Sequence, residues 1–348
     1  MAVMAAVTVL LLPSLTRRIY LGDRVDASVS SVASSCVHQR QRSWRTTAVR
    51  CRDEITQYRS CVIDAVRSEL NAQTHDETQL RDRLVRLLER CNASQIRALL
   101  NAQLLPVGGE ERFTLMPASD GNNATTTEAA VRVLSLGIGN ETDTERLLKE
   151  RLPEAQFIGV EPIAQNALTY LQLGRVINAG VAFADGVQTL SVLRYDAANR
   201  PYYADAGQLQ VIGLRSLLNA LQWPLVDFVY LDIEGYEYEL LAKERFGVRQ
   251  RLLASGPYND TVAVPRLSAV QPQPLVLCQL YAELHGPLER YHRDAGDDAG
   301  AALKRLLVRL LDEDSPFMAL RAYNVYGHTK LGLVNVEHQH CWTTYRTC

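Results

Sequence analysis

The stretch Asp227–Glu237, with the sequence DFVYLDIEGYE, decides the fold predicted for this chain. Its first half is a continuous apolar run, which is typical of a strand buried on both faces of a parallel sheet. Its second half places two carboxylates, Asp232 and Glu234, directly after the strand, and Gly235 lets the following helix pack closely. Ligands of open α/β sheets bind at the carboxyl ends of the strands, so this stretch predicts a ligand site at that edge.

On both sides of this stretch, apolar runs alternate with amphipathic segments. Such alternation predicts a mostly parallel sheet with helices on both faces. Two apolar runs near the C-terminus follow one another closely and predict an antiparallel edge. The expected strands span 131–136, 156–160, 176–183, 188–195, 227–232, 274–284, 317–327 and 328–338, and the expected helices span 142–151, 164–173, 213–221, 234–244 and 300–311.

A glycine loop, Leu136–Asn140 (LGIGN), follows the first of these strands. Glycines there allow a sharp turn and a close approach of a ligand to the backbone, and the next helix offers free N–H groups. Thr142 and Glu145 have the spacing of a capping box for that helix. A dinucleotide fingerprint would need glycine where Thr142 stands. The loop therefore favours a nucleoside ligand without a pyrophosphate over NAD.

Glu161 ends the second strand of this unit, in FIGVEP. A carboxylate at this position accepts hydrogen bonds from the hydroxyl groups of a ribose. NAD enzymes and methyltransferases share this device, so it identifies a ribose and not a reaction. The alternative is an acid that only precedes a helix.

Two further strand ends supply candidate catalytic residues. Asp232 is expected to hold the amino group of a cofactor or to act as a general base, with Glu234 within reach of the same space; the alternative is helix capping by Asp232. Alternation places Glu283 and His285 on one face after the strand 274–284, and His285 could deprotonate a hydroxyl near neutral pH. Tyr236 and Glu237 are interpreted as structural.

No metal site is predicted. His292, His328, His338 and His340 are ligand types, and Cys341 adjoins the last of them, but no second cluster at a fixed spacing accompanies them. A disulfide competes for Cys341. The formal net charge of −2 gives no general attraction to nucleic acid.

The N-terminal part of the chain is expected to be organised differently. Residues 2–12 are apolar, too short to span a membrane, and predict a secretory signal or a short membrane anchor, followed by a linker to residue 50. Residues 51–104 predict a small helical segment, whose second helix opens at a capping box over 74–77 and places Leu80, Leu84, Leu87 and Leu88 on one face. Residues 105–127 have the composition of a linker, and 128–348 form the main domain.

Cysteines and glycosylation sequons favour the secretory pathway. The chain has seven cysteines, and Cys278 is expected to be a buried free thiol because it lies inside an apolar run. The remaining six flank the predicted core, and their pairing is left open. Asn-x-Ser/Thr sequons stand at Asn92, Asn123, Asn140 and Asn259. Together these features favour the endoplasmic reticulum, Golgi or extracellular space, with the cytoplasm as the alternative.

The motifs LGIGN, FIGVEP, VDFVYLDIEGYEYELL and CQLYAELHGP, in this order, resemble FkbM-type methyltransferases. The resemblance is closest to the animal branch, common in nematodes, whose members have an N-terminal signal or anchor. It covers about residues 131–337. It implies a Rossmann-like, class I methyltransferase fold with a seven-stranded sheet, S-adenosyl-L-methionine as cofactor, and O-methylation of a hydroxyl on a glycan or other secretory-pathway acceptor.

The same resemblance implies that Gly137, Gly139 and Glu161 hold the cofactor, and Asp232 and Glu234 match the acidic strand end of the family. Asn140 of the glycine loop and Asp232 are further candidate cofactor-binding residues. Asp232, Glu234 and His285 are the candidate catalytic residues.

Two positions depart from the family pattern. Ser135 stands where many methyltransferases have an acid, and Asn140 replaces a small residue and lies in a sequon. The alternative is therefore a catalytically inactive protein that retains the fold as a secreted binding or structural module.

Overall fold

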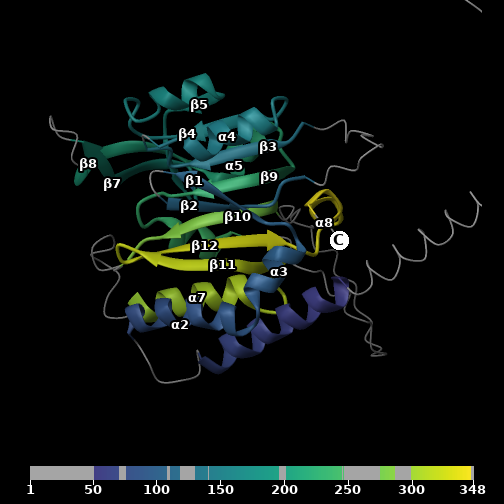
Figure 1. The fold of residues 1–348 in the computed structure, drawn as a ribbon. Coiled ribbons are helices and arrows are strands. Elements are labelled where there is room, and N and C mark those ends of the chain that lie inside the picture. Colours follow the sequence, from purple (N-terminus) through teal and green to yellow (C-terminus); the bar gives the residue numbers. More distant parts are fainter. Residues whose placement is uncertain are drawn as a thin grey trace, which may run out of the picture. The chain divides into compact units, whose positions relative to one another are not determined.

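The computed structural model describes residues 51–69, 76–107, 110–117, 130–139, 141–195, 201–244, 246, 275–286 and 299–345 (Figure 1). Arg50–Cys348 forms one compact unit. The predicted helical segment and the main domain therefore belong to the same unit. The predicted signal or anchor over 2–12 and the linker that follows it lie outside the described residues.

Within the described residues, a seven-stranded sheet has the order β11-β12-β10-β9-β3-β4-β5 (Figure 1). Neighbouring strands from β10 to β5 are parallel, whereas β12 runs antiparallel to both of its neighbours. This arrangement confirms the predicted parallel sheet with an antiparallel C-terminal edge and is Rossmann-like. The bounds are β3 Arg132–Leu136, β4 Gln156–Val160, β5 Arg175–Ile177, β9 Leu225–Leu231, β10 Val276–Leu284, β11 Phe317–Val325 and β12 His328–Asn335.

The strand order reverses at β3, because β4 and β5 extend the sheet on one side while β9 and β10 extend it on the other. Leu136 at the end of β3 pairs with Val160 of β4 and with Leu231 of β9. The next residue along each strand is therefore Gly137, Glu161 or Asp232, at the same level of the sheet edge. A reversal of this kind opens a crevice where ligands of α/β proteins bind.

A second, three-stranded sheet has the order β6-β8-β7. Its strands are β6 Gly180–Ala182, β7 Gly186–Tyr195 and β8 Pro201–Gly213. The prediction of a single strand over 176–183 was wrong, because this stretch contributes to two strands. Ile177 ends β5 in the large sheet, and Gly180 begins β6 in the small one. The side chain of Asn178, between them, donates to the carbonyls of Glu161 and Pro162. The helix expected over 164–173 is only a short 3-10 helix, η1 Leu168–Gln172.

Most of the other predicted helices are present. They are α4 Asp143–Arg151, α5 Leu214–Leu221, α6 Glu237–Lys243 and α7 Ala299–Leu311, and a C-terminal helix, α8 Gln339–Tyr345, was not predicted. The helix over 51–69 is followed by α2 Glu77–Arg90 and α3 Ala93–Leu99. α2 packs against β11 and α7 (Figure 1). Its N-cap is Asp76, whose carboxylate accepts from the N–H groups of Thr78 and Gln79.

Residues 105–107 and 110–114 differ from the linker predicted over 105–127, since they belong to an antiparallel strand pair of β1 Gln103–Val107 and β2 Glu110–Thr114. Phe113 and Leu115 are buried, and Gln279 of β10 exchanges two hydrogen bonds with the backbone of Leu115. The glycines and prolines of this stretch resemble a loop in composition. Phe113 and Leu115 have the two-residue spacing of a strand, but two positions are too few to predict one.

The expectation of a free thiol at Cys278 was wrong, because Cys278 forms a disulfide with Cys341 of α8. The apolar strand pattern correctly predicted that Cys278 is buried, but it carries no information about the C-terminal helix that covers the strand. A second disulfide joins Cys61 to Cys91, which is the C-cap of α2. Disulfides fit an oxidising environment. Among the described residues, no helix has the length and apolar character needed to cross a membrane.

Candidate functional site

An open hollow lies at the carboxyl edge of the large sheet, at the point where the strand order reverses. The structure brings the predicted residues Gly137, Gly139, Glu161, Asp232 and Glu234 together on its wall. Asn140 lies outside the described residues. The opposite part of the wall is mostly apolar and comes from the small sheet, through Gly180, Val181, Leu190, Val192 and Leu193.

The glycine loop passes directly over the end of β9. Gly137 has a φ of +78°, and a Cβ on it would lie 1.6 Å from the carbonyl oxygen of Asp232. The N–H of Gly137 donates to the Val160 carbonyl, and the N–H of Asp232 donates to the Leu136 carbonyl. Gly139 has a φ of +57°, and a Cβ there would meet nothing within 4 Å. Gly137 therefore serves the crossing of the chain, whereas Gly139 leaves open space.

The carboxylate of Glu161 is fixed by the loop that it faces. One of its oxygens accepts from the N–H groups of Ile138 at 3.1 Å and Gly139 at 3.3 Å, and the other accepts from the N–H of Ile163 at 3.0 Å. Burial raises the pKa of Glu161, and these three hydrogen bonds offset only part of that effect. A carboxylate offers about four lone-pair sites, so at least one remains for a ligand donor.

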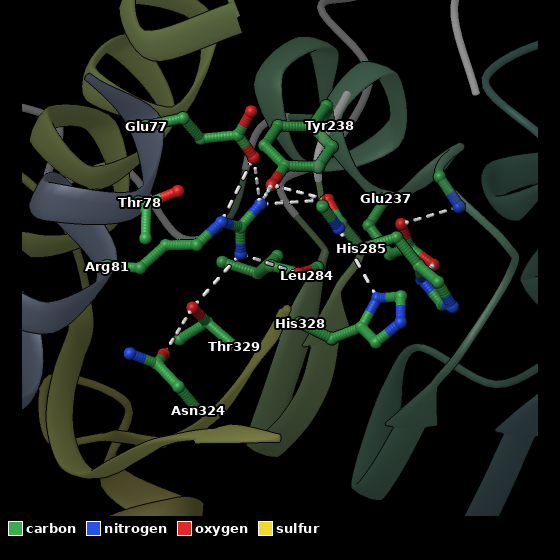
Figure 2. Close-up of polar contacts among 12 residues, drawn as sticks. Glu77, Thr78, Arg81, Glu237, Tyr238, Leu284, His285, Asn324, His328 and Thr329 are labelled. Carbon is green, nitrogen blue, oxygen red and sulfur yellow. Dashed lines mark hydrogen bonds and ion pairs between the residues drawn. The ribbon is translucent and has the colours of Figure 1, made fainter. Parts of the chain in front are cut away.

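His285 lies behind the hollow, with carboxylates at both ring nitrogens. Figure 2 shows Glu237 beside His285, whose Nδ1 is 3.0 Å from Glu237 Oε1. The other ring nitrogen, Nε2, is 3.1 Å from Glu234 Oε2 and 3.6 Å from Asp232 Oδ1. Only 2% of His285 is exposed, and none of Glu237 is. Carboxylates accept hydrogen bonds, so the arrangement favours a proton on each nitrogen of the ring.

The electrostatics agree with that geometry. Burial lowers the pKa of His285, but the charges of Glu237, Glu234 and Asp232 outweigh it, so that the pKa is well above the ordinary value. The ring is then positively charged at neutral pH and is a poor acceptor for a hydroxyl proton. Burial, together with the charges of Glu283 and Glu234, raises the pKa of Asp232 well above its usual range, despite the opposing charges of His285 and Lys330.

Glu283, which was expected to share a face with His285, forms an ion pair with Lys330 of β12. Burial raises the pKa of Glu283, but Lys330 and His285 lower it more, so the net shift is downward. The ring of His328 stands edge-on to that of His285, with centroids 4.6 Å apart. Burial and the neighbouring charge of His285 lower the pKa of His328 to about 4.

The predicted capping box at the start of α4 is absent. Thr142 is the N-cap residue but makes no side-chain cap hydrogen bond. Glu145 instead points into the core, where it accepts from Ser135 at 2.8 Å and pairs with Arg112 of β2 at 2.9 Å. Many methyltransferases have an acidic residue in the strand where this chain has Ser135. Here the acidic side chain beside that position comes from α4 instead, as Glu145.

Three groups of described residues have metal-ligand types within 4.8 Å of one another: Asp232, Glu234 and His285; Glu283, His285 and His328; and Asp227, Cys278 and His340. The last group includes a disulfide-bonded cysteine. Of the histidines examined in the sequence, His340 lies 3.2 Å from Asp227 and His338 lies near Cys341, whereas His292 is outside the described residues. The sequence pattern thus missed the groups that form around His285.

Sequence reasoning also missed Glu237 and Arg81. Glu237 was interpreted as structural, yet it accepts from the N–H groups of Ile233 and Gly235 and faces the His285 ring. The sequence feature that could have indicated Glu237 is its position: it is an acidic residue three positions after Glu234, on the first turn of α6. Arg81 showed no signal beyond being a basic residue on an apolar helix face.

Comparison with family models, with curated proteins and with solved structures finds no match to this chain.

Proposed function

We propose that this protein is an S-adenosyl-L-methionine-dependent methyltransferase that methylates a hydroxyl on a glycan or another secretory-pathway acceptor. The observation that supports this most strongly is the shared hollow of Gly137, Glu161 and Asp232 at the reversal of the strand order. Each of these residues comes one position after the paired end of its strand. The proposal also rests on the resemblance of the four motifs to FkbM-type methyltransferases.

The wall of the hollow suits a nucleoside. Glu161 has lone pairs left for a ribose hydroxyl after its three backbone hydrogen bonds. Val181, Leu190 and Val192 give an apolar surface for the flat base. Gly139 would bring the backbone close to the ligand without an interfering side chain. Asp232 would accept from an amino group.

When bound, S-adenosyl-L-methionine supplies an activated methyl group, so the protein's main task is to orient the acceptor and to accept its proton. Asp232 and Glu234 both line the hollow, and 35% of the Asp232 side chain is exposed. Asp232 is the candidate proton acceptor because its carboxylate lines the hollow and its pKa is raised above the usual range, which makes the ionised form a stronger base. His285 does not line the hollow and is already protonated, so it holds the two carboxylates in place. This replaces the expected role of His285 as the base.

Calorimetric titration with S-adenosylhomocysteine tests the proposal. Wild-type protein is expected to bind, and Glu161→Gln to bind at least about tenfold more weakly, since an amide presents donors as well as an acceptor. Binding by the wild type should also weaken as the pH falls through the raised pKa of Glu161, because protonation removes an acceptor; Glu161→Gln should lose this dependence.

Turnover with methyl-labelled S-adenosyl-L-methionine and a panel of hydroxyl-bearing glycans tests the catalytic part. Asp232→Asn should fold and be inactive, and full turnover by that variant would remove Asp232 from the mechanism. A folded wild-type protein that binds no S-adenosylhomocysteine would instead favour the inactive binding or structural module.

A further inference from the structure

Arg81 of α2 is a buried arginine at the end of β10, remote in sequence from every candidate site residue. Its side chain is 4% exposed. Its guanidinium donates to the carbonyls of Leu284 at 2.7 Å and His285 at 2.8 Å (Figure 2). It also donates to the hydroxyl groups of Thr329 and Tyr238, and it pairs with Glu77 on its own helix.

These contacts fix the backbone where β10 stops being a strand. The last residue pair of β10 with β12 is Leu284 with Thr329, so His285 lies beyond the ladder. Buried carbonyls need donors, and a guanidinium can serve several acceptors in one plane. The close fit also explains Gly286, since a Cβ there would lie 2.6 Å from Arg81 Nη2. The chain has no room for a larger residue beside this arginine.

The residue that Arg81 holds, His285, also contacts carboxylates that line the hollow. Tyr238 donates to the His285 carbonyl at 2.9 Å, and the adjacent residue on α6, Glu237, faces the ring at 3.0 Å. The other side of the ring faces Asp232 and Glu234. One residue, His285, therefore connects the guanidinium of an N-terminal helix to the carboxylates that line the hollow.

We propose that Arg81 is a positioning residue, which holds His285 so that its ring sets the orientation of Asp232 and Glu234. The N-terminal helix α2 thereby helps to order the part of the hollow that Asp232 and Glu234 line. The catalytic consequence rests on the proposed function, whereas the effect on the His285 ring does not.

The test compares Arg81→Met, which keeps the length and removes the donors, with Arg81→Lys. Arg83→Met is the matched control, because Arg83 lies on the same helix, is partly exposed and pairs with the partly exposed Glu69. Imidazole NMR signals report on the ring, and the His285 signals are assigned by their loss in His285→Gln. Arg81→Met should shift the His285 signals and reduce turnover at least about tenfold, with the affinity for S-adenosylhomocysteine unchanged. Arg81→Lys should give intermediate shifts, and Arg83→Met none.

Unchanged His285 signals in a folded Arg81→Met protein would overturn the proposal. If Arg81→Met does not fold, Tyr238→Phe replaces it: this variant removes one donor to the same carbonyl, leaves the pair of Arg81 with Glu77, and should give a smaller shift of the same signals. Unchanged signals there would also contradict the proposal. Because the NMR comparison needs no ligand, a wild-type protein that fails to bind S-adenosylhomocysteine would reject the proposed function and leave the test of Arg81 decisive.

Discussion

Gly137 and Gly139 stand two residues apart in one loop, and both have a left-handed φ. Their surroundings differ, because a Cβ on Gly137 would collide with the backbone of Asp232 while a Cβ on Gly139 would enter open space. Gly137 is therefore needed for the crossing of the chain over β9, whereas Gly139 keeps space open beside the hollow. Substitution by alanine can measure each requirement by itself.

Gly137→Ala is expected to destabilise the protein by more than about 2 kcal/mol, since it adds a backbone clash to the cost of a left-handed alanine. Gly139→Ala should cost only about 1 kcal/mol, for the left-handed conformation alone, yet it should weaken S-adenosylhomocysteine binding because Gly139 lines the hollow. Urea unfolding and calorimetry measure the two effects. Equal losses of stability in the two variants would contradict this assignment.

The sequence could predict the residues of the hollow because the ends of parallel strands meet at one edge of a sheet. Gly137, Glu161 and Asp232 each follow an apolar strand that its pattern identifies. The protonation of His285 could not be predicted in this way, because it depends on Glu237 turning back from α6 and on the distance between two strand ends. Arg81 was still less predictable. Its pair with Glu77, four residues earlier, has the spacing of an ordinary ion pair along a helix, and its contacts with the carbonyls of Leu284 and His285 leave no trace in a sequence pattern.

At the scale of elements, the apolar runs identified the strands of the parallel sheet, because such strands are buried on both faces. The hairpin β1–β2 and the helix α8 were missed for a common reason. Both are short elements that cover an existing sheet, and each has too few apolar residues to establish a period. α8 is held on the sheet by the disulfide from Cys341 to Cys278 and by the hydroxyl of Tyr345, which donates to Asp227 at 2.8 Å.

Replacing Cys278 and Cys341 together with alanine is expected to destabilise the protein by about 2–4 kcal/mol, as the bond closes a loop with a sequence separation of 63 residues. The affinity for S-adenosylhomocysteine should stay unchanged. Cys278 lies near the start of β10, at the amino end of the parallel strands, and the hollow lies at their carboxyl end. Urea unfolding and calorimetry check the two statements, with the Cys61→Ala, Cys91→Ala pair as the matched control for a lost disulfide. A large loss of affinity on removing Cys278 and Cys341 would show that the two ends of the sheet are coupled.

On the scale of the whole molecule, the N-terminal helices and the sheet share one hydrophobic core. The sequence predicted the apolar face of α2 correctly, and Leu80, Leu84, Leu87 and Leu88 are all buried. It did not show which surface covers that face. The structure shows that α2 packs against β11 and α7, and that the described residues on both sides of the boundary expected near residue 127 belong to one compact unit.

A fragment of residues 128–348 is therefore expected to lose cooperative folding, although it contains the complete parallel sheet. Burying the four leucines of α2 contributes about 1.5–3 kcal/mol each, or about 6–12 kcal/mol in total, which is comparable to the whole stability of a typical domain. Removing the helices also exposes the apolar surfaces of β11 and α7 and takes away the Arg81 contacts at His285. Urea unfolding followed by circular dichroism, together with binding of a hydrophobic dye, compares this fragment with residues 50–348, which should unfold in one cooperative transition. Cooperative unfolding of the shorter fragment at the same urea concentration would show that the helices are an appendage, and that α2 has no part in forming the site.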